Sequence, residues 1–243
     1  MKTEKLVVNV LTNLILFVAI SCVACISFYG GVSNVVALTD KNQPYFRGNE
    51  ACKQVSIMIN VYWGTEYLDA TLDILDKYNV KATFFVGGDW VSKNSDVLSK
   101  IALKQHEIGN HGYFHKSHDK LSYQQNVDEI VACQKVVESV CCVKTTLFAP
   151  PSGAYSKNTL NAAASLGYKT IMWSKDTIDW RDKDTNLIYS RATKNLSNGD
   201  LVLMHPTKNT VEALPKIIKY YIDAGFEIVT VGKNLSGDTN AIL

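Results

Sequence analysis

The sequence has almost no excess of charge of either sign. Its 243 residues carry 25 lysines and arginines against 23 aspartates and glutamates, a formal net charge of +2 at pH 7. A protein that binds nucleic acid through its phosphates needs a basic surface, so this balance argues against a nucleic-acid partner. A content of 47% hydrophobic residues also excludes a disordered tail or a collagen-like fibre. One domain with a sizeable core is expected.

Nucleotide-binding signatures are absent as well. The sequence contains neither a GxGxxG turn nor a GxxxxGK[ST] loop. These glycine-rich loops bring backbone N–H groups close to phosphates. Their absence argues against a nucleotide-binding doubly wound sheet.

Charged residues are missing altogether between positions 6 and 39, directly after Lys2 and Lys5. This apolar stretch reaches the roughly 20 residues that cross a bilayer, and the two lysines indicate a cytoplasmic start. Small residues between positions 19 and 31 are equally typical of a signal-peptide cleavage site. We therefore expect residues 1–39 to be a transmembrane anchor or a signal peptide, and the remainder to lie outside the cytoplasmic membrane.

The remainder divides into a short polar segment and a folded domain. Residues 40–52 are polar and contain Pro44 and Gly48, as is typical of a linker or an ordered arm. Residues 53–243 are expected to form the domain, because short apolar runs alternate there with segments of helical periodicity about seven times. This alternation predicts a parallel sheet covered by helices. Without a nucleotide motif, an α/β barrel of about seven strands is favoured.

The expected elements follow from this periodicity. Strands are expected at residues 55–61, 82–86, 106–109, 146–148, 170–173, 201–204 and 227–231. Helices are expected from a cap at Thr65 onward and at residues 91–104, 123–140, 157–166, 185–195 and 211–224.

Four of the five histidines fall between His106 and His118. His111 and His115 follow an expected strand and stand four residues apart, a spacing that can bring two imidazoles onto one metal ion. They would leave the carboxyl end of a barrel strand, where barrel active sites lie. Two solvated loop histidines are the alternative.

Several phrases resemble those of a known family. They are GNHGYFH around His111 and His115, FAPPSG at 148–153, DTIDW at 176–180 and LMH at 203–205. They resemble, in order, four of the five motifs of the polysaccharide deacetylase (NodB-homology, carbohydrate esterase 4) family. The similarity covers about residues 55–235, and the NVYWG and APPSG phrases resemble its sporulation-associated branch in particular.

The resemblance implies a distorted (β/α) barrel that removes N-acetyl groups from cell-wall or spore-wall amino-sugar polymers with a divalent metal such as Zn or Co. His111 and His115 would hold the metal, which lowers the pKa of a bound water. His205 would be the general acid, oriented by Asp179. The walls for a sugar ring would be formed by Trp180, Pro151 and Tyr155.

The first motif departs from the family pattern. In the family, TFDDG supplies a catalytic base and a metal-ligating aspartate, whereas this sequence has Asn60 and Val61 in INVYWG. A shift of one or two residues would place Tyr62 or Trp63 there instead, and no alignment supplies an aspartate. The arginine of the third motif, which pairs with the base, is replaced by Ala149. An amide cannot accept a proton at neutral pH, so Asn60 is an altered base position. The remaining candidate carboxylates are Glu66 and Asp176.

Three functions are therefore compatible with the sequence. The first is an exported, metal-dependent deacetylase of peptidoglycan or a related glycan, with an altered base and a weakly bound metal. The second is a glycan-binding module of the same fold that has lost catalysis. The third is a deacylase or amidohydrolase that acts on another substrate.

Overall fold

The computed structural model of the protein describes residues 42–237. The expected anchor or signal peptide at residues 1–39 lies outside the described residues. Between residues 42 and 237, no helix is both long enough and apolar enough to cross a membrane.

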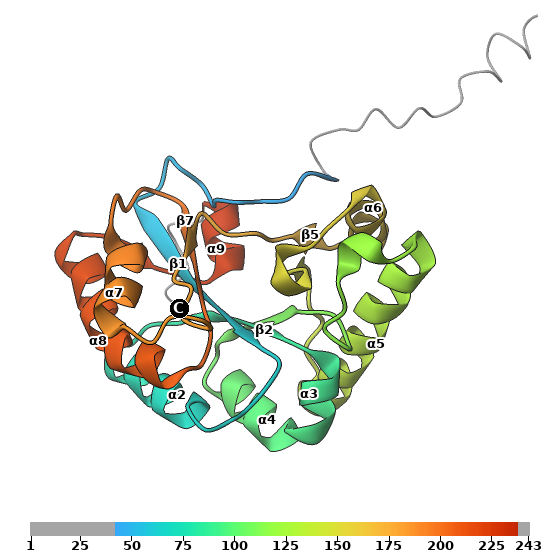
Figure 1. The fold of residues 1–243 in the computed structure, drawn as a ribbon, viewed down its shortest axis with the longest axis horizontal. Coiled ribbons are helices and arrows are strands. Elements are labelled where there is room, and N and C mark those ends of the chain that lie inside the picture. The colour runs from blue at the N-terminus through green and yellow to red at the C-terminus, as the bar shows by residue number, and fades with distance from the viewer. Residues whose placement is uncertain (1–41, 238–243) are drawn as a thin grey trace, which may run out of the picture. The chain divides into compact units, whose positions relative to one another are not determined.

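A parallel sheet forms the centre of the fold (Figure 1). Seven strands follow in the order β5-β4-β3-β2-β1-β7-β6, and β8 pairs with the first residues of β1. The strands are β1 Gln54–Val61, β2 Thr83–Val86, β3 Glu107–Asn110, β4 Leu147–Phe148, β5 Lys169–Thr170, β6 Lys175–Asp176, β7 Asp200–Met204 and β8 Glu227–Ile228. Among the described residues no pairing joins β5 to β6, so the sheet curls without closing. This confirms the predicted distorted barrel.

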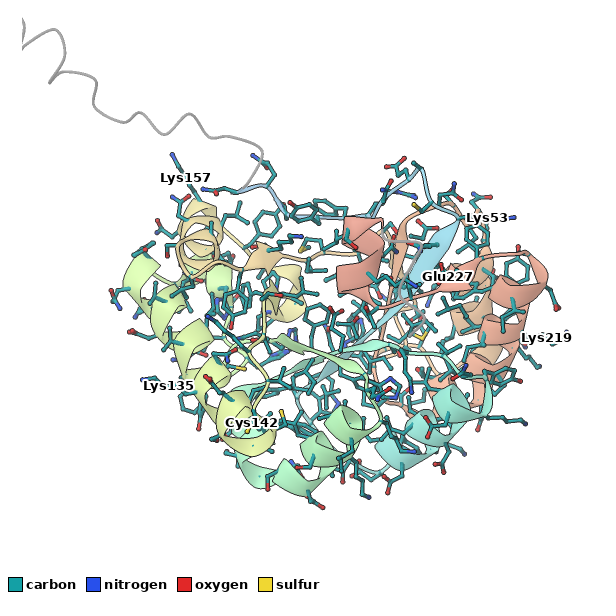
Figure 2. The ribbon with its side chains drawn as sticks, turned by 180° about the vertical axis from the view of Figure 1, so that it is seen from behind. Lys53, Lys135, Cys142, Lys157, Lys219 and Glu227 are labelled. Atoms are coloured by element: carbon teal, nitrogen blue, oxygen red, sulfur yellow. The ribbon has the colours of Figure 1, made fainter. Side chains whose placement is uncertain are left out.

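Helices pack around this sheet (Figure 1). They are α2 Leu68–Lys77, α3 Gly88–Lys93, α4 Ser95–Leu103, α5 Tyr123–Cys141, α6 Lys157–Ser165, α7 Thr185–Thr193, α8 Lys208–Asp223 and α9 Val231–Ser236. Figure 2 shows lysines of α5, α6 and α8 pointing away from the sheet, namely Lys135, Lys157 and Lys219. Because all strand pairs are parallel, every strand ends on the same side of the sheet, where the connecting loops gather.

The side chains of β1 alternate between two cores. Ile57, Ile59 and Val61 lie in the core between the sheet and the helices, together with leucines of α2. Met58 points the other way, into the barrel interior. Strand residues alternate in this manner because successive Cβ atoms point to opposite faces. The alternation places Asn60 on the interior side, at the end of the strand.

Residues 42–52 cross from β5 to β7 (Figure 1). The Tyr45 N–H donates to the Thr170 carbonyl at 2.9 Å, and Arg47 forms an ion pair of 2.7 Å with the fully buried carboxylate of Asp200. A buried carboxylate needs such partners. These contacts favour an ordered arm over a linker, and the folded contacts begin before residue 53.

Two helix predictions were wrong in their boundaries. The helix expected at 91–104 is broken into α3 and α4 at Asn94, whose φ of −137° is not helical and whose side-chain Nδ2 donates to the Trp90 carbonyl at 2.9 Å. The expected cap at Thr65 is also wrong, because α2 begins at Leu68 with Tyr67 as its N-cap residue. Residues 62–67 instead form a loop at the end of β1.

The last strands are shorter than predicted. The strand expected at 170–173 ends at Thr170, and β6 follows at Lys175–Asp176, which sequence patterning did not indicate. The strand expected at 227–231 ends at Ile228, because the Thr230 side chain caps α9. Such two-residue strands carry too little periodicity to be recognised from sequence.

Candidate active site

A cavity of about 260 Å³ lies at the carboxyl ends of the strands. Its walls come from the ends of β1, β3, β4, β6 and β7 and from the segments that follow these strands and β5. The lining residues are Asn60, Trp63, His111, His115, Ser152, Trp173, Asp176, Trp180, Leu203 and His205. The structure thus brings together six of the predicted residues, although they are spread from Asn60 to His205 in the sequence.

His205 and Asp179 form a pair at the end of β7. The His205 Nδ1 lies 2.8 Å from one Asp179 oxygen, and the other oxygen accepts the His205 backbone N–H at 2.6 Å. That second oxygen also accepts the hydroxyl of Thr210, a residue that sequence reasoning missed. A buried carboxylate with these donors fixes the imidazole by its Nδ1, which leaves Nε2 for a ligand in the cavity. Asp179 therefore orients His205 and does not cap a helix.

His111 and His115 lie on the loop after β3, with ring centroids 5.1 Å apart. His111 is buried, and its Nδ1 lies 2.7 Å from the Ala149 carbonyl oxygen. A carbonyl oxygen can only accept, so Nδ1 carries the proton and Nε2 holds the free lone pair. Gly112 has a φ of +72°, and a Cβ there would lie 2.8 Å from the His118 ring, so only glycine fits this turn.

A buried carboxylate of α5 holds the same loop. Glu129 accepts the backbone N–H groups of Tyr113 and Phe114 at 2.9 and 2.7 Å, and its other oxygen pairs with Lys116 at 2.8 Å. The backbone of the loop is therefore held directly before residue 115, and the Lys116 side chain is paired directly after it. Sequence reasoning missed Glu129, because a glutamate in the middle of a helix normally indicates a solvated face.

The histidines of this loop are held neutral. Burial, followed by the neighbouring His115, lowers the pKa of His111 well below its ordinary value. Burial likewise lowers the pKa of His115. Neutral imidazoles can accept hydrogen bonds or bind metal ions at neutral pH.

The donor set for a metal ion is incomplete. The two imidazoles on one loop, with Nε2 of His111 free, fit two ligand positions of one ion. Residues 42–237 contain no group of three or more His, Cys, Asp or Glu side chains that is placed to hold a metal. Catalytic zinc sites use three protein ligands, so the residues present do not complete such a site.

Asn60 ends β1 on the interior side, where the resemblance implies a base. It is 5% exposed, and its Oδ1 is buried without a hydrogen-bond partner among the described residues. An unpaired buried amide oxygen costs free energy, so the Asn60 Oδ1 is available to accept a hydrogen bond from a ligand. Ala149, where the resemblance implies an arginine, is fully buried in the barrel interior.

Two aromatic residues of the β1–α2 loop bridge the histidines. The Trp63 ring is stacked on His205, with centroids 6.0 Å apart and an interplanar angle of 11°, and it meets the edge of His115 at 5.9 Å. Tyr62 packs on His115 at 4.6 Å. Sequence reasoning assigned no role to Trp63, since nothing local connects it to loops from other strands.

The other sequence-predicted residues are placed as follows. Trp180 lines the cavity and is 56% exposed, and Asp176 lines it from the end of β6. Glu66 is exposed, and its carboxylate accepts the neighbouring Thr65 N–H at 3.0 Å. It is not among the lining residues, and neither are the other two predicted wall residues, Pro151 and Tyr155. Ser152, beside Pro151, lines the cavity in their place.

The amino-acid sequence is similar to those of known proteins. The family model for polysaccharide deacetylase matches residues 47–171. The chain is 40% identical over 78% of its length to the uncharacterized protein YlxY of Bacillus subtilis and spans 59% of that protein. It is 33% identical to a peptidoglycan-N-acetylglucosamine deacetylase of Bacillus cereus, over 70% of this chain and 82% of that protein.

A solved structure gives the same fold. BA3943 of Bacillus anthracis, described as a CE4 family pseudoenzyme, is 36% identical and superimposes with a TM-score of 0.78 over 80% of this chain and 69% of that one. A BA3943 mutant described as having restored enzymatic activity superimposes equally well, at 34% identity. With the motifs, the barrel and these relatives in agreement, the chain belongs to the polysaccharide deacetylase (carbohydrate esterase 4) family.

Proposed function

We propose that this chain is a glycan-binding member of its family, which takes an amino-sugar polymer of the peptidoglycan type into the cavity without hydrolysing it. The observation that carries this proposal is Asn60, an amide at the position where catalysis needs a carboxylate. Loss of a general base typically lowers the rate by about 10²- to 10⁴-fold. The relative described as a pseudoenzyme supports the loss of hydrolysis, and the relative named a peptidoglycan deacetylase supports the type of glycan.

The cavity keeps features suited to a sugar. Trp63, Trp173 and Trp180 line it, and flat aromatic faces pack well against the apolar faces of sugar rings. Trp63 and Trp180 are each 56% exposed, which is unusual for large rings that serve only the core. Exposed aromatics at a cavity are typical of binding sites.

Metal-dependent deacetylation is the second candidate function. The His205–Asp179 pair, at 2.8 Å, retains the geometry of a general acid and its orienting carboxylate. A binding module has no evident need for this pair, which favours some hydrolysis. The missing base and the incomplete ligand set weigh against it.

The proposed location follows from the proposed ligand. Peptidoglycan lies outside the cytoplasmic membrane, so we place the domain there as well. Residues 1–39 would be its membrane anchor or signal peptide, as the sequence predicts.

Glycan binding is tested by sedimentation of the full-length chain with insoluble peptidoglycan. We expect Trp180→Ala to weaken binding about tenfold, the cost typical of truncating a central tryptophan. Phe46→Ala is the matched control, because Phe46 is a large ring of similar exposure, 47%, that does not line the cavity. Equal binding by the two variants, or no binding by the wild type, would contradict the proposal.

A further inference from the structure

We propose that the cavity prefers a de-N-acetylated amino sugar, with a free ammonium group, over the N-acetylated form. This inference rests on the proposed glycan binding and names the form of the sugar. It follows from the charges and hydrogen-bonding groups that face the cavity.

The formal charge on the wall is negative. Asp176 is the only carboxylate among the ten lining residues, and no lysine or arginine belongs to this set in the described part of the chain. One Asp176 oxygen accepts the Ile178 N–H at 2.8 Å. Its second oxygen has no partner among the described residues, so it remains available to a donor.

The neighbouring cation is already engaged. Arg181 lies 5.9 Å from the ring centroid of Trp180, but its guanidinium is paired with Asp182 at 2.8 Å. Asp182 also binds Arg191 at 2.6 Å. Asp176 therefore has Arg181 as an electrostatic neighbour but no directly paired cation among the described residues.

The imidazole of His111 presents a lone pair. His111 uses its Nδ1–H on the Ala149 carbonyl at 2.7 Å, which leaves its Nε2 as an acceptor. His205 is held by Asp179 through Nδ1 at 2.8 Å. The indole faces of the three tryptophans add regions of negative potential, and tryptophan is the aromatic residue that attracts cations best.

An ammonium group matches these walls better than an acetamide does. It brings three donors and a positive charge to a carboxylate, to the acceptor nitrogen of His111 and to indole faces. The acetamide brings one N–H donor and one carbonyl oxygen. For this oxygen the cavity lining offers no lysine or arginine among the described residues. A hydrogen bond to a charged group favours binding by about ten- to a hundredfold.

The test is calorimetric titration of the full-length chain with the β-1,4-linked tetrasaccharide of glucosamine and with its fully N-acetylated counterpart, below the pKa of the sugar amine. We expect the free amine form to bind at least tenfold tighter. Asp176→Asn keeps the acceptor for Ile178 but removes the charge, and it should abolish this preference. Glu66→Gln is the control, because Glu66 is an exposed carboxylate of the Trp63 loop that does not line the cavity, and it should leave the preference intact.

The outcomes separate this inference from the function on which it rests. Equal or tighter binding of the N-acetylated tetrasaccharide, or a preference that persists in Asp176→Asn, would overturn the inference and leave glycan binding standing. Binding of neither tetrasaccharide would contradict glycan binding itself.

Discussion

The double variant Asn60→Asp/Ala149→Arg is expected to release acetate from an N-acetylated glycan about 10²-fold faster than either single variant. Asn60→Asp alone places a carboxyl group at a site that is 5% exposed. Burial without a partner raises the pKa of such a group, so it would be a poor base at neutral pH. The arginine supplies the opposite charge that lowers this pKa, and the gain should exceed the sum of the single effects.

The arginine also has a cost. Ala149 is fully buried among side chains of the barrel interior, and overpacking of a core typically costs about 1–3 kcal/mol. Asn60→Asp/Ala149→Met is therefore the control, because methionine adds length without charge. Acetate release is measured with zinc in excess, because His111 and His115 provide only two protein ligands and the metal is expected to bind weakly. Equal release by the arginine and methionine variants would show that charge pairing is not the cause.

Val61→Asp is expected to lower the free energy of unfolding by about 3 kcal/mol or more. In the family pattern this position provides a metal-ligating aspartate. Here Val61 is 0% exposed and lies in the helix-side core, on the opposite side of β1 from the cavity. A carboxylate would therefore enter an apolar core without a partner. The measurement is urea unfolding at neutral pH.

Val61→Asn separates charge from size, because it has the shape of aspartate and no charge. It should destabilise the protein less than Val61→Asp does. If Val61→Asp instead kept the wild-type stability and raised the affinity for zinc, the side chain would be able to turn into the cavity. The assignment of residue 61 to the core would then be wrong.

Much of the fold could be predicted because its long elements carry strong periodicity. β1 is buried along its whole length and mostly apolar, and α8 has buried residues at helical spacing, so both were found within a few residues. β6 and α9 were missed, because two and six residues leave almost no pattern. The break at Asn94 depends on a side-chain bond to Trp90, which a periodicity argument does not contain.

The residues of the cavity were predictable where they belong to the sequence motifs. His111, His115, His205 and Trp180 do meet at one cavity. The residues that support or cover them were not predictable. Glu129 of α5 and Thr210 of α8 hold the loops that carry His115 and Asp179, and Trp63 lies on a third loop. Only the parallel sheet brings those loops together.

The cavity is proposed to bind a glycan without hydrolysing it. The most direct test is acetate release by the full-length wild-type chain from an N-acetylated peptidoglycan fragment, with zinc in excess and His205→Ala as the background. We expect no release above that background, whereas the fragment still binds. Glycan binding without hydrolysis would be contradicted if the wild type released acetate above the His205→Ala background and at a rate close to that of Asn60→Asp/Ala149→Arg. Another group would then be serving as the base.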